Sequence, residues 1–301
     1  MSHTKSTFGS VRLLLIVAVF TLGAVGWCPA GEPQPNDRQV ELEKASLLRS
    51  RVEELFARGK FAEAEQPAED AVKLYEKALG PDDAEVGRSV YFLAAVNKAQ
   101  EKYPEADALL DRAQAILEKA KGAVHPTVAM CLADRADAQT ALGNHDKANE
   151  FFARADDIFA KTIGEDDPGA VANLQHWIIA CRAQRKPDAA ERLCRKILAV
   201  QDKSPTPDDS ARWFALVELG NACTDQKKYD EAEPAYKRAI TIVEARDPKH
   251  IFVATTLESL ANMYSLAGRE ADAVAARHRA APIFAADEAA REIEDLILPL
   301  E

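Results

Sequence analysis

The chain has 301 residues, of which 47% are apolar and only 7% aromatic, so it is long enough for one or two ordinary domains with a sizeable core. This balance, with only 13 glycines, favours closely packed helices over strands. The net charge of −11 disfavours general binding to nucleic-acid phosphates and to anionic membrane surfaces.

The N-terminus resembles a targeting segment. Basic residues precede an apolar stretch from 13 to 27, and no acidic residue occurs before Glu32. The stretch is short for a membrane span, which needs about 20 residues. We therefore expect residues 1–30 to be a cleaved secretory signal peptide, so that the chain is exported to the periplasm or the extracellular space without later membrane insertion. A retained anchor is the main alternative; lipidation of Cys28 is disfavoured because the bulky Trp27 precedes it.

A polar, proline-bearing stretch follows, and we expect residues 31–40 to form a flexible linker. Beyond it the dominant feature is an internal repeat of about 42 residues. One alanine marks each repeat, and we call it the anchor. The anchors are Ala64, Ala106, Ala148, Ala190, Ala232 and Ala273.

Flanking positions repeat with the anchors. Apolar or small residues recur sixteen and twelve positions before each anchor and seven positions after it. Positions four apart share one helix face, so each repeat predicts two helices joined by a short turn. Glycine stands five positions before three anchors, where the chain must reverse, whereas Arg185 takes this place in the fourth repeat. We still expect that hairpin to form, because its apolar positions keep their register.

The turn segments GKFAEAE (59–65), EKYPEAD (101–107) and KKYDEAE (227–233) carry a resemblance to a known family. They are similar to tetratricopeptide repeats, in the longer subtype found in kinesin light chains. The resemblance covers about residues 42–285 and implies an all-α fold, a right-handed α-solenoid of about six helical hairpins over residues 41–285. It says little about function.

The end of the chain differs from the repeats. Pro282 interrupts the last helical pattern, and proline in a helix interior removes a hydrogen bond and clashes with the preceding turn. We therefore expect residues 286–301 to form a separate C-terminal capping helix, with Ile293, Leu296 and Ile297 covering the end of the stack.

No motif for catalysis, for a cofactor or for a metal ion emerges from the sequence. Cys181, Cys194 and Cys223 are expected near one another between the fourth and fifth repeats. They are either small buried apolar residues or, in an oxidising compartment, include one disulfide. Among the histidines, only His176 is expected on a face that can meet a ligand.

The resemblance implies that the first helices of the hairpins line a concave groove. The stripe of residues eighteen, fifteen, eleven and eight before each anchor supplies cations, apolar side chains and amides, which suit a peptide or loop of mixed apolar and acidic character. With His176 beside this stripe, the predicted groove residues are Arg88, Tyr91, Lys98, Met130, Gln175, His176, Ile179, Arg182, Phe214, Asn221 and Asn262. We thus expect a non-catalytic scaffold or adaptor with a protein partner. A self-assembling structural protein and a non-catalytic subunit of an enzyme complex are the alternatives.

Overall fold

The computed structural model describes residues 35–297, and this part of the chain consists of twelve α-helices without strands. The first helices of the six hairpins are α1 (Pro35–Ala57), α3 (Ala84–Ala99), α5 (Pro126–Ala141), α7 (Pro168–Ala183), α9 (Asp209–Asp225) and α11 (Ile251–Leu266). The second helices are α2 (Phe61–Leu79), α4 (Tyr103–Lys121), α6 (His145–Thr162), α8 (Pro187–Gln201), α10 (Tyr229–Glu244) and α12 (Glu270–Ile297). None of these helices is long and apolar enough to span a membrane.

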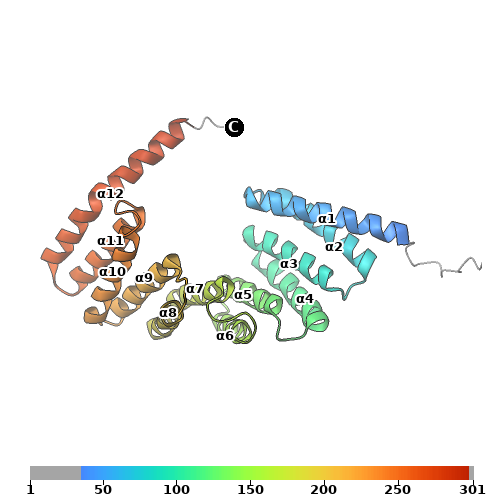
Figure 1. Cartoon of the computed structure of the whole chain (residues 1–301), viewed down its shortest axis with the longest axis horizontal. Coiled ribbons are helices and arrows are strands. Elements are labelled where there is room, and N and C mark those ends of the chain that lie inside the picture. Colours follow the sequence, from blue (N-terminus) through green and yellow to red (C-terminus); the bar gives the residue numbers. More distant parts are fainter. Residues whose placement is uncertain (1–34, 298–301) are drawn as a thin grey trace, which may run out of the picture.

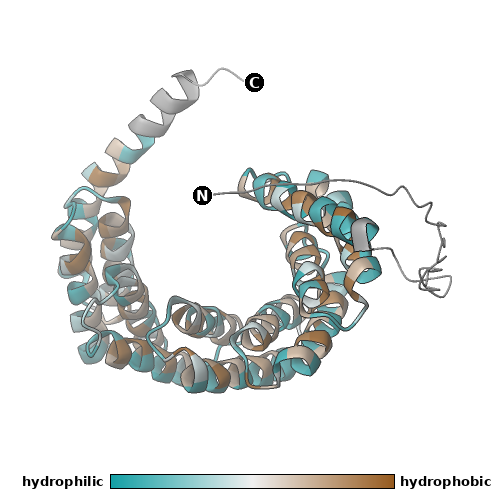
Figure 2. Ribbon diagram, turned by 45° about the vertical axis from the view of Figure 1, so that its right-hand side comes forward, coloured by the Kyte–Doolittle hydropathy of each residue, from teal (hydrophilic) through white to brown (hydrophobic). Residues whose placement is uncertain are grey.

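The hairpins follow one another around an open arc (Figures 1 and 2). Successive first helices contact one another directly, as α5 does with α7 and α7 with α9. They form the inner layer of the arc, and helices such as α6 and α8 form the outer layer (Figure 1). The expected α-solenoid of hairpins is confirmed, and its inner layer provides a concave face.

The anchors form the contact line between the two layers. All six anchor alanines are fully buried. The residues seven positions later are also buried, as for Ala113 and Ile197. Small side chains at these positions let each second helix approach its neighbours closely, which explains why the anchors recur in the sequence.

Every hairpin turn has a residue in the left-handed backbone conformation at the same position of the repeat. The residue five positions before the anchor has a positive φ in all six repeats, namely Gly59 (70°), Glu101 (60°), Gly143 (78°), Arg185 (52°), Lys227 (61°) and Gly268 (74°). Glycine adopts this conformation without strain, whereas other residues adopt it at a cost of about 1 kcal/mol. The fourth hairpin, α7 and α8, forms in spite of Arg185, as expected.

Each inner helix after α1 begins with a side-chain cap. Asp83, Asp167 and Asp208 accept a hydrogen bond from the backbone N–H two residues later, each at 2.8 Å. His125 and His250 accept the equivalent bond through Nδ1, at 3.2 and 3.1 Å. These caps satisfy backbone donors that the helix leaves unpaired, and they fix where each inner helix starts. His125 and His250 are therefore capping residues.

Two series of ion pairs tie successive repeats along the outer layer, except between the third and fourth repeats, where Asp156 pairs with Lys196 at 2.8 Å instead. An acidic residue twelve positions after one anchor pairs with the arginine six positions after the following anchor. The pairs are Glu76–Arg112, Glu118–Arg154, Asp202–Arg238 and Glu244–Arg279. A second series starts one position after the anchor and reaches the base four positions before the next anchor. Its members are Glu65–Lys102, Glu191–Lys228 and Glu233–Arg269.

The two ends of the solenoid depart from the sequence-based expectation. The helix α12 continues through Pro282 to Ile297 without a break, so the prediction of a separate helix over 286–301 is wrong. Ala280 and Ile283 are buried on either side of the exposed proline, and this packing holds both halves of the helix in one register. The side chains expected to cover the stack, at 293, 296 and 297, lie outside the described side chains.

The prediction of a flexible linker over 31–40 is wrong from Pro35 onwards, because α1 begins there. Proline is favoured in the first turn of a helix, where its missing N–H costs nothing, and Asp37 suits the positive end of the helix dipole. Residues 31–34 and the expected signal peptide lie outside the described residues.

Candidate functional site

The predicted groove residues all lie on inner helices. Arg88, Tyr91 and Lys98 are on α3, Met130 is on α5, Gln175, His176, Ile179 and Arg182 are on α7, Phe214 and Asn221 are on α9, and Asn262 is on α11. Each is at least partly exposed. The apolar side chains of Met130 and Ile179 are 42% and 51% exposed. The groove stripe read from the repeat therefore occupies one accessible face.

Polar side chains in the middle of this face form one network across three repeats. Lys98 on α3 binds Asp134 and Asp137 on α5, the latter at 3.1 Å. The other partner of Asp137 is His176 on α7, whose Nδ1 lies 2.8 Å from the carboxylate. This hydrogen bond raises the pKa of His176 above its ordinary 6.5, since the carboxylate stabilises the imidazolium. The inner helices α3, α5 and α7 are thus joined by one chain of charges.

Each cation of the groove has an acidic partner within the protein. Besides Lys98, Arg182 donates to Glu218 at 2.5 Å, and Arg88 pairs with Glu85 at 3.1 Å. Glu218 is only 6% exposed, and burial raises the pKa of its carboxyl although Arg182 lowers it. The sequence predicts that the cations of this stripe suit a partner of mixed apolar and acidic character. In the structure, Lys98 and Arg182 pair with carboxylates one repeat further along the chain.

Hydrogen bonds orient two of the groove amides. Asn221 Oδ1 accepts from the Tyr236 hydroxyl at 2.8 Å. Asn262 Oδ1 accepts from Arg277 on α12 at 3.1 Å. Because these partners belong to the second helices, the outer layer fixes the direction in which each amide faces the groove.

An apolar hollow lies at the N-terminal end of the groove, between α1, α3 and α5. It has a volume of about 590 Å³ and is lined by Val52, Glu53, Phe56, Ala57, Tyr91, Phe92, Ala95, Lys98, Ala99, Met130 and Asp134. The prediction from sequence included Tyr91, Lys98 and Met130 but missed Glu53 and Phe56. These two stand eleven and eight positions before the first anchor, so the same stripe extended to the first repeat finds them.

The four cysteines of the described residues, Cys131, Cys181, Cys194 and Cys223, are free and buried. Burial raises the pKa of each thiol, to about 12 for Cys131 and about 11 for Cys223. Of the two alternatives left open by the sequence, the structure shows buried small residues and no disulfide among these four.

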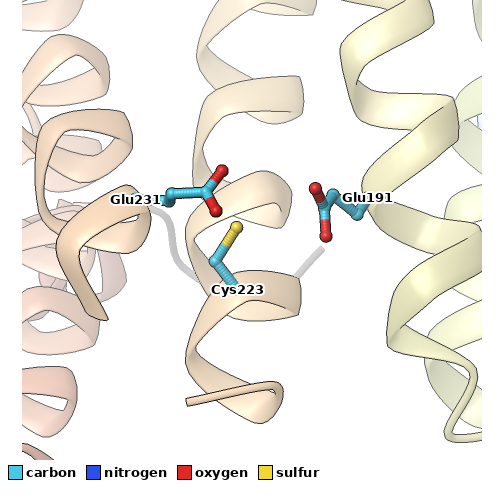
Figure 3. A group of neighbouring side chains, drawn as sticks. All are labelled: Glu191, Cys223 and Glu231. Atoms are coloured by element: carbon cyan, nitrogen blue, oxygen red, sulfur yellow. The ribbon is translucent and has the colours of Figure 1, made fainter. Parts of the chain in front are cut away.

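One further cluster has the composition of a metal site. The ligating atoms of Glu191, Cys223 and Glu231 lie within 4.8 Å of one another (Figure 3). Both carboxylates, however, are already paired, since Arg195 binds each of them and Lys228 binds Glu191 at 2.9 Å. These pairs account for the cluster as part of the contacts between repeats, and the raised pKa of the thiol opposes the thiolate that a metal needs.

Family comparisons identify the class of protein. Models of the tetratricopeptide repeat match residues 52–85, 88–161, 170–244 and 213–285. The chain therefore belongs to the tetratricopeptide repeat family. Among curated proteins, no sequence matches it.

Several solved structures share the fold of this chain. The chain is similar to kinesin-light-chain-type repeats from Podosopora anserina, with 23% identity and a TM-score of 0.60, covering 68% of this chain and 98% of the other. It also resembles BtubC (BKLC) from P. vanneervenii, with 18% identity and a TM-score of 0.61, covering 83% and 92%. A tetratricopeptide repeat protein from Parabacteroides merdae matches with 20% identity and a TM-score of 0.54, covering 78% and 77%. These likenesses show that the chain has the fold of these proteins, an α-solenoid of tetratricopeptide repeats.

Proposed function

We propose that this chain is an exported, non-catalytic adaptor that binds a peptide or loop of a partner protein in its concave groove. The observation that carries the proposal is the exposure of large apolar side chains along the inner face, where Phe56, Met130 and Ile179 are each more than two-fifths exposed. Exposed apolar groups collected in a concave surface favour binding of another chain. Export rests on the composition of residues 1–30 alone.

The ends of the solenoid support this adaptor over a self-assembling structural protein. The last repeat has Val274 and Ala285 where the two ion-pair series would need acidic residues. The first repeat has Asp70 where one series would need arginine. A second copy stacked end to end would therefore find neither of the ion pairs that join repeats within the chain. Sedimentation across concentrations tests this: a single species of one-chain mass agrees with the adaptor, and growing species would contradict it.

Membership of an enzyme complex as a non-catalytic subunit is a special case of the same binding activity. The partner would then carry the catalysis, and the groove would still hold it. The identity of captured partners distinguishes this case from a scaffold for non-enzymes.

Crosslinking and affinity capture of the tagged full chain from its own cells test the proposal. The groove variant carries Met130→Glu and Ile179→Glu, which place charge on the inner face at exposed positions. Leu142→Glu is the matched control, because Leu142 is 39% exposed at the end of α5 but outside the predicted groove. All variants must first show wild-type helicity and melting. A partner held by the wild type and the control but lost by the groove variant supports the proposal, whereas equal capture by all three overturns it.

A further inference from the structure

The apolar hollow at the N-terminal end of the groove continues into a smaller one. The second hollow, of about 330 Å³, is lined by Arg88, Tyr91, Phe92, Leu117, Lys121, Thr127 and Met130. The two share Tyr91, Phe92 and Met130, so they form one continuous surface across α3. We call it the N-terminal cleft. Its middle is apolar, and its two ends differ in charge.

One end of the N-terminal cleft is acidic. Glu53 has no partner among the described side chains and lies on the rim. Asp134 also lines this end, and Asp137 lies beside it on α5. Lys98 pairs with both aspartates, so a single ammonium faces three carboxylates. Negative charge therefore prevails here, and His176 offsets it only when protonated.

The other end of the cleft is basic. Lys121 at the end of α4 has no partner within the described part of the chain. Arg88 lies beside it and shares the carboxylate of Glu85 with Arg49, at 3.1 and 2.9 Å. The charged side chains that line this end are Arg88 and Lys121, and the one carboxylate that pairs with Arg88 also pairs with Arg49, so positive charge prevails at this end although the whole chain carries −11.

We infer that the N-terminal cleft binds a partner segment in which a large apolar side chain is flanked by a basic residue on one side and an acidic residue on the other. The inference rests on the proposed function and specifies its partner. The apolar side chain fills the hollow between Phe56, Tyr91 and Met130. Its flanking charges meet the acidic and basic ends, and this order of charges fixes the direction in which the segment lies. A segment with one sign of charge would meet repulsion at one end.

Selection from a random twelve-residue peptide library displayed on phage tests the inference. The bait is the full chain, and peptides are kept if they bind the wild type but not a Met130→Glu variant, or separately a Phe56→Glu variant. We expect the retained peptides to carry an apolar residue with opposite charges on its two sides, in one prevailing order. For a retained peptide, Glu53→Lys and Lys121→Glu should each weaken binding about tenfold. Glu150→Lys is the control for net charge, because Glu150 lies on the outer helix α6 and is exposed.

The outcomes separate the two proposals. Retained peptides that carry only acidic residues, or no charge beside the apolar residue, would overturn the inference and leave groove binding intact. Binding equally sensitive to Glu150→Lys as to Glu53→Lys would do the same. If no peptide depends on Met130 or Phe56, this inference fails; the proposed function is then decided by the capture experiment with Met130→Glu and Ile179→Glu.

Discussion

At Gly220, α9 approaches its own second helix, α10, closely. A Cβ atom at this position would lie 2.6 Å from two ring carbons of Tyr236 on α10 and 2.8 Å from a third. Tyr236 is 1% exposed, and its hydroxyl donates to the groove residue Asn221. The ring therefore has no free space to move into without losing that hydrogen bond. We predict that Gly220→Ala destabilises the chain.

The magnitude follows from two opposed effects. Alanine is favoured over glycine within a helix by about 1 kcal/mol. Extra volume in a packed core costs about 1–3 kcal/mol, and three contacts below 3 Å place this case near the upper value. We therefore expect a net loss of about 1–2 kcal/mol from the free energy of unfolding. When Tyr236 is first replaced by alanine, only the helix preference remains, and Gly220→Ala should then stabilise by about 1 kcal/mol.

Urea unfolding followed by far-ultraviolet circular dichroism measures this double-mutant cycle at constant m-value. The four chains are the wild type, Gly220→Ala, Tyr236→Ala and the double variant. The expected coupling between the two positions is about 2–3 kcal/mol. A neutral or stabilising Gly220→Ala in the wild-type background, or the same effect in both backgrounds, would refute the steric reasoning. Weaker groove binding by Gly220→Ala would further show that Tyr236 positions Asn221.

Three further predictions concern titration and thiols. Lys228 and neighbouring donors lower the pKa of Glu191 to about 2, so this carboxylate stabilises the fold above its unfolded pKa of 4.5. Its contribution should fade as the pH falls from 4.5 towards 2. The urea midpoint should therefore fall less between pH 5 and pH 3 in Glu191→Gln than in the wild type. Asp137 raises the pKa of His176 above 6.5. The stabilisation of the fold by this ion pair is therefore complete below pH 6.5 and fades as the pH rises through the raised pKa. Proton NMR titration should show a lower His176 pKa in Asp137→Asn, and an unchanged pKa would contradict the ion pair. In a Cys28→Ala chain, which leaves Cys131, Cys181, Cys194 and Cys223, the four buried thiols should resist Ellman's reagent at pH 8 and all react in urea. Fewer than four reactive thiols in urea without reductant would reveal a disulfide.

The sequence by itself determined the architecture, because the repeat is a local signal. A buried anchor, apolar residues four apart and a left-handed turn residue all lie within one hairpin, so their spacing predicts two helices and the face that each buries. The predicted groove residues lie on inner helices and are at least partly exposed, and their role in binding stays a prediction. Even the fourth repeat, with Arg185 at its turn, followed this rule, since Leu174, Ile178, Ala190 and Ile197 are all buried.

Only the tertiary structure decided which charges of the inner face are paired and where the last helix ends. Asp134 and Asp137 neutralise Lys98 from the next inner helix, which only the stacking of repeats brings within reach. Pro282 remains within a helix because packing of the residues beside it outweighs a local preference for a break. Sequence spacing thus predicts which side chains of an inner helix are exposed, since this depends on one helix. Which charges remain unpaired in the groove depends on distances between helices of different hairpins. The sequence of a single hairpin does not contain these distances.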